Sequence, residues 1–98
     1  MSRTMHHDAI VELRGELDER SRGEIARSFE GLERCHNVLI DLSAAQFVHS
    51  ALLSELVLLK RRCVVREEPP HVEVRCNPRI ARIMSVAGLD RLFEMSST

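Results

Sequence analysis

The stretch VLIDLSAAQFVHSALLSEL, residues 38–56, contains the residues that decide the fold. Its first part, Val38 to Leu42, is apolar except for Asp41. This is typical of a strand covered on both faces, as in a parallel sheet with helices packed against it. From Ser50 onward, apolar residues would lie on most sides of a helix and not only on one face. A helix of this kind is buried and does not lie on the surface. The stretch therefore predicts a central strand followed by a largely buried helix.

Strand and helix signals continue upstream of this stretch. Residues 9–14 favour a strand, which the segment at residues 15–18 is expected to end. Residues 22–34 have helical periodicity, and Ser21 with Glu24 has the spacing of a capping box. The upstream part is thus expected to be one strand and one amphipathic helix.

Downstream, two adjacent prolines in residues 66–70 predict a loop. Residues 71–76 alternate as in a strand, and a helix is expected from Pro78 to Gly88 with Asn77 as its cap. The alternation of elements predicts an α/β fold with a parallel or mixed central sheet of about four to five strands. About four α-helices are expected to pack on this sheet, joined by right-handed crossovers.

The composition is that of one globular domain. The 98 residues, 44% hydrophobic and 30% charged, suffice for one core, which we place at about residues 9–93 of a single domain, 1–98. Fourteen basic residues against 15 acidic ones, with the arginines scattered, disfavour direct binding of nucleic acid. The sequence shows no transmembrane segment and no signal peptide, so we expect a cytoplasmic protein.

No catalytic site, metal site or cofactor is expected. His49 and Ser50 are neighbours in the chain, and such neighbours rarely point at each other as a base and a nucleophile must. His6 and His7 with Cys35 and His36 do not have the spacing of a structural zinc site. The odd number of cysteines, without a Cys-x-x-Cys pair, argues against a disulfide framework.

Three motifs together resemble the STAS domain family. They are GELD at residues 15–18, VLIDLS at 38–43 with FVHS at 47–50, and NPRIARI at 77–83 with AGLDRLF at 87–93. The family comprises the bacterial anti-sigma factor antagonists and the cytoplasmic domains of sulphate transporters. The resemblance implies the STAS fold and a regulatory binding function.

In the antagonists of this family, the strand precedes the motif Asp-Ser-Ser/Thr-Gly-Leu-Gly, whose first hydroxyl residue is phosphorylated by a partner kinase. Here the stretch reads HSALLS, so Ser50 falls on the phosphorylated position and Leu53 on the motif leucine. The other four positions depart from the motif; they are His49, Ala51, Leu52 and Ser54. A leucine in place of the first glycine would block the close approach of a partner or offer it an apolar contact.

The resemblance implies docking on an anti-sigma factor or on a serine kinase of the histidine-kinase-like ATPase fold. A phosphate on Ser50 would add about −1.5 to −2 charges at the start of a helix and release the partner. Residue preference also favours Ser50 as the cap of that helix. We expect a partner surface around Ser50, with Leu52 as its anchor if exposed, made of Asp18, Gln46, His49, Ser50, Ala51, Leu52, Leu53 and Ser54.

The departures from the motif leave a second function open. A STAS scaffold subunit that is not phosphorylated, for example a partner of a lipid-transport ABC ATPase, would not need the motif. A weak homodimer is also left open, because the alternating strand at residues 71–76 would expose one face if it lay near an edge of the sheet.

Overall fold

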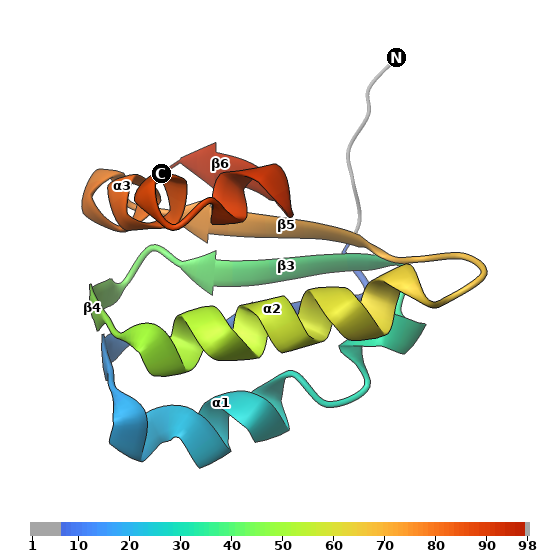
Figure 1. Cartoon of the computed structure of the whole chain (residues 1–98), viewed down its shortest axis with the longest axis horizontal. Helices are drawn as coiled ribbons and strands as arrows, with labels where there is room; N and C mark the ends of the chain where they lie inside the picture. The colour runs from blue at the N-terminus through green and yellow to red at the C-terminus, as the bar shows by residue number, and fades with distance from the viewer. Residues whose placement is uncertain (1–6, 98) are drawn as a thin grey trace.

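The computed structural model describes residues 7–97, which form an α/β fold of six strands, three α-helices and three short 3-10 helices. The elements occur in the following order: β1 (Ala9–Glu12), β2 (Gly15–Leu17), η1 (Glu19–Ser21), α1 (Arg22–Ser28), η2 (Leu32–Arg34), β3 (Asn37–Leu42), β4 (Ala45–Val48), α2 (Ser50–Val64), β5 (His71–Cys76), α3 (Pro78–Val86), η3 (Leu89–Arg91) and β6 (Glu94–Ser97). The predicted α/β class is confirmed (Figure 1).

Four strands form the central sheet in the order β1-β3-β5-β6, and each adjacent pair is parallel. Since β3 lies between β1 and β5, the prediction of a central strand at Val38 to Leu42 is confirmed. β5 is interior too, because β6 pairs with its far side. The strand at residues 71–76 is therefore not at an edge, and this ground for a homodimer is removed.

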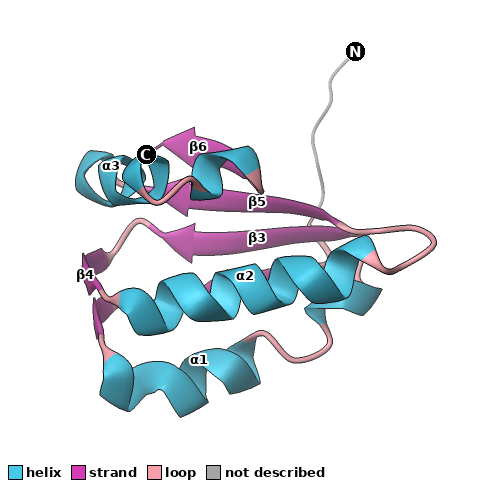
Figure 2. Cartoon of the chain, in the orientation of Figure 1, coloured by secondary structure: helices cyan, strands magenta, loops and turns pink. Residues whose placement is uncertain are grey.

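The helices pack on one face of the central sheet (Figure 2). Alternate side chains of β3 and β5 join the helices in one hydrophobic cluster: Val38, Ile40, Leu42, Val72, Val74 and Cys76. On the opposite face, the Arg75 guanidinium lies 4.0 Å from Asp41, and Nε2 of His7 lies 3.1 Å from Oε1 of Glu73. Leu39 also lies on this second face and is 4% exposed, so β3 is buried on both faces at this residue, as predicted, with polar side chains beside it.

The first helix is shorter than predicted. α1 ends at Ser28, and Gly31, with φ of 78°, separates it from η2. Ser21 makes no capping hydrogen bond, because it already belongs to η1, whose cap is Asp18. The predicted capping box at Ser21 and Glu24 is therefore wrong, although the expected helical segment at residues 22–34 is partly present.

Two segments expected to be non-regular form a second, two-stranded parallel sheet. β2 covers most of the segment that was expected to end the first strand, and β4 lies in the expected loop before Ser50. Leu17 pairs with Val48, and the Gly15 N–H donates to the carbonyl of Ala44 at 3.1 Å. These pairs bring the segment after β2 to the segment after β4.

The turn between β3 and β4 is held by side chains on both sides. The Asp41 carboxylate accepts hydrogen bonds from the Ser43 backbone N–H at 3.0 Å and its hydroxyl at 2.6 Å. The Asn77 amide donates to the carbonyls of Ser43 and Ala45 at 3.2 and 3.0 Å, and its Oδ1 accepts from the Ile80 N–H at 2.9 Å. The predicted cap of α3 is confirmed, and it also anchors the start of β4.

Candidate functional site

The residues predicted to meet a partner gather where β2 and β4 end. The backbone N–H of His49 donates to the carbonyl of Leu17 at 3.1 Å, which extends the pairing of the two strands by one residue. Asp18 follows Leu17 in the chain, so it lies close to His49. The structure thus brings Asp18 and the start of α2 together.

Asp18 is fixed mainly by Arg20. Its carboxylate accepts a hydrogen bond from the Arg20 backbone N–H at 3.0 Å and another from the guanidinium at 3.0 Å. The guanidinium hydrogen bond is the largest cause of the lowered pKa of Asp18, ahead of the weaker attraction of His49. Asp18 therefore presents a fixed negative charge beside the first turn of α2.

Ser50 is the first residue of α2 and does not cap it. The cap is His49, whose backbone is extended, with φ of −109° and ψ of 176°, and whose side chain makes no capping hydrogen bond. The prediction that Ser50 caps the helix is therefore wrong by one residue. The Ser50 side chain is exposed. In the first turn of α2 the backbone N–H groups of Ser50 and Ala51 have no carbonyl partner among the described residues, whereas that of Leu52 donates to the carbonyl of His49 at 3.1 Å.

Two residues of the predicted partner surface lie in the core. Ala51 and Leu52 are both 0% exposed, and Leu52 packs in the hydrophobic cluster with Leu56 and Leu59. The expected partner contacts of Ala51 and Leu52 are therefore wrong, because α2 directs both side chains inward. Gln46 and His49 are exposed, whereas Leu53 and Ser54 are half-buried.

The STAS domain family model matches residues 2–98, which is nearly the whole chain. The chain belongs to the STAS domain family. The fold of this STAS domain is similar to that of an anti-sigma factor antagonist from Mycobacterium paratuberculosis, with a TM-score of 0.80 and 24% sequence identity. That comparison covers 96% of this chain and 82% of the other. Among curated protein sequences, none matches this STAS domain.

Phe47 is an exposed residue of the site that the sequence analysis missed. It lies on β4 opposite Glu16, it is 51% exposed, and its ring centroid is 4.9 Å from that of His49. The sequence carried no clear signal of this exposure, because the alternation of a strand would place Phe47 on the same face as Ala45, which is buried. Phe47, unlike Leu52, is an exposed apolar side chain beside His49.

The metal and nucleophile sites considered from the sequence involve mainly residues of the described part of this STAS domain. Residues 7–97 hold no group of three or more histidine, cysteine or acidic side chains that could bind a metal ion, and His6 lies outside them. No hydrogen bond joins His49 to Ser50 within this part of the chain. None of its helices is long and apolar enough to cross a membrane.

Proposed function

We propose that this STAS domain is a regulatory binding module of the anti-sigma factor antagonist type in a bacterial cytoplasm. It docks on an anti-sigma factor that is also a serine kinase of the histidine-kinase-like ATPase fold, and phosphorylation of Ser50 releases it. The observation that carries the proposal is the exposed Ser50 at the first position of the 15-residue α2, on the position that the family phosphorylates.

The surroundings of Ser50 support modification without a change of fold. A phosphate there would meet the partially positive end of α2 and the free backbone N–H groups of Ser50 and Ala51, which favour an anion. Asp18 lies nearby and would repel it, but Asp18 is already paired with Arg20. The domain can therefore accept the phosphate, whereas a partner docked over the same point would face a buried dianion.

The motif departures fit this proposal better once their side chains are placed. Leu52 stands at the position of the first motif glycine, yet it is 0% exposed and cannot obstruct a partner. Ser54, at the position of the second glycine, is half-buried. The contact surface we propose therefore consists of Asp18, Gln46, Phe47, His49 and Ser50.

Incubation with ATP and the proposed partner kinase tests the proposal. We expect the intact mass to rise by one phosphate group, because Ser50 is exposed at a helix start. The rise should disappear in Ser50→Ala and persist in the matched control Ser54→Ala, which changes a half-buried serine one turn further along α2.

Two outcomes contradict the phosphorylation switch. One is an active kinase that leaves the mass of the wild-type chain unchanged, and the other is a mass gain that survives Ser50→Ala. An unmodified chain that instead co-purifies with a transporter ATPase would favour the scaffold function, because that function needs no phosphate.

A further inference from the structure

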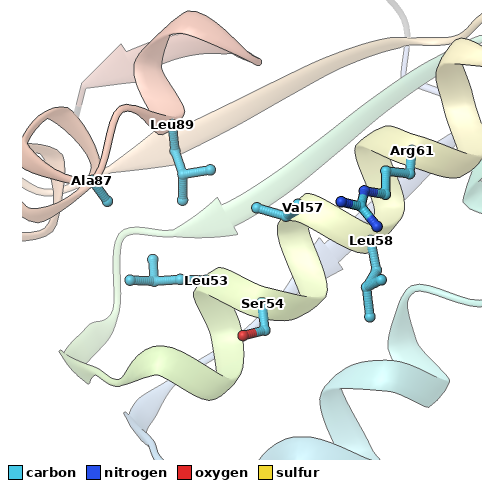
Figure 3. A pocket seen from close by; sticks show the side chains of 7 residues that line it. All are labelled: Leu53, Ser54, Val57, Leu58, Arg61, Ala87 and Leu89. Atoms are coloured by element: carbon cyan, nitrogen blue, oxygen red, sulfur yellow. The ribbon is translucent and has the colours of Figure 1, made fainter.

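An apolar groove lies between α2 and α3, next to the proposed contact surface but separate from Ser50. We define the groove by two adjoining hollows of about 390 and 410 Å³ that share Leu53 and Ala87. In Figure 3 the side chains of Leu53 and Val57 lie on the side of α2 that faces Ala87 and Leu89. Leu53, the motif leucine, joins the start of α2 to this groove.

The α2 wall of the groove is a regular helical stripe. Leu53, Val57 and Arg61 line it at intervals of four residues, so they lie on one side of α2 over about 12 Å. The α3 wall has the same character, with Ile83 followed by Val86, which is 85% exposed. Two apolar walls with this spacing are typical of a groove that receives an amphipathic helix.

The charges at the groove have one sign. Arg61 lines one hollow and Arg82 the other, both are exposed, and neither hollow has a carboxylate among its lining residues. Within residues 7–97, no ion pair involves either arginine. An incoming helix with apolar residues flanked by carboxylates would complement this pattern in charge.

The described helices of this chain do not have that pattern, which disfavours a second copy as the occupant. α1 carries a single acidic residue, Glu24, and α3 carries none. The only acidic residue of α2, Glu55, is buried beside Arg22. The described helices of a second copy therefore do not complement the groove in charge, which favours a helix of a different chain.

We infer that the groove between α2 and α3 binds an acidic amphipathic helix of the partner kinase, whose carboxylates meet Arg61 and Arg82. The inference rests on the proposed function, because its occupant is the kinase proposed there. The groove adjoins the Ser50 surface through Leu53. It adds a second contact with the kinase, on residues that the phosphate does not touch.

Binding of the unphosphorylated chain to the kinase, measured by calorimetry, tests this inference. We expect the double variant Arg61→Glu/Arg82→Glu to bind at least about tenfold more weakly, since each reversed charge would repel a carboxylate. The matched control Arg34→Glu/Arg66→Glu has the same change in net charge at a hollow formed by the segments after η2 and α2, and should bind within about twofold of wild type. Val86→Asp should weaken binding, whereas Val65→Asp, at a valine that is 81% exposed, should not.

The results separate this inference from the proposed function. Normal phosphorylation of Ser50 together with wild-type affinity of Arg61→Glu/Arg82→Glu overturns the groove contact alone. A kinase that neither binds nor phosphorylates the wild-type chain overturns both. If Val86→Asp dissociates a dimer of the chain in sedimentation experiments and leaves kinase affinity unchanged, the occupant is a second copy and the inference is wrong.

Discussion

Leu52→Gly, which restores the first glycine of the family motif, is expected to lower the free energy of unfolding by about 5 kcal/mol. Removal of a fully buried leucine side chain costs about 2–5 kcal/mol, and a glycine in a helix costs up to about 1 kcal/mol more. Leu52 is 0% exposed in the hydrophobic cluster, so the upper half of this range applies. This loss is a large part of the free energy of unfolding of a typical domain, which is about 5–15 kcal/mol.

Urea denaturation of Leu52→Gly measures this loss, with Ser54→Gly as the matched control. Ser54→Gly restores the second motif glycine at a half-buried position, and it should cost only about 1 kcal/mol. A loss below about 1 kcal/mol for Leu52→Gly, accompanied by faster phosphorylation of Ser50, would show that Leu52 obstructs the site and does not belong to the core.

Phe47→Ala is expected to weaken binding of the partner kinase at least about thirtyfold, which corresponds to about 2 kcal/mol. Aromatic side chains beside the centre of an interface are frequent anchors, and Phe47 lies half-exposed against His49, close to Ser50. Its unfolding free energy should fall by only about 1 kcal/mol, because half of the ring is already in contact with solvent.

Affinity and stability should be measured together for Phe47→Ala, with Ile10→Ala as the control. Ile10 is 63% exposed and lies on β1, in the central sheet rather than in the β2–β4 sheet. We expect Ile10→Ala to bind like the wild type. If Phe47→Ala binds within about threefold of the wild type, Phe47 is no anchor and the proposed surface is wrong at this residue.

The sequence predicts those elements whose side chains are buried with a regular period. β3, α2, β5 and α3 were located because their apolar residues or their caps, such as Asn77, are local signals. β2, β4 and β6 were missed because they are short and are stabilised by pairing with another strand. Glu16 of β2 lies opposite Phe47 of β4, and Ser96 of β6 lies opposite Arg75 of β5. Pairing of distant segments leaves little trace in a single local pattern.

For the site, the sequence located the residues but not their orientation. Asp18 and Ser50 were placed at the same edge, which the pairing of β2 with β4 explains. The burial of Leu52 depends on where α2 begins, and the recurrence of Leu52, Leu56 and Leu59 on one stripe already indicated it. The cap was assigned to Ser50 from residue preference, but backbone geometry gives that position to His49.

The most direct test of the central claim is the dissociation constant of the complex with the kinase, measured before and after complete phosphorylation of Ser50. A charge left buried without a partner costs about 2–5 kcal/mol, so we predict at least about thirtyfold weaker binding. The circular dichroism spectrum of the free chain should remain unchanged, because the phosphate lies on the exposed first residue of α2. Equal dissociation constants for the two forms would contradict the phosphorylation switch.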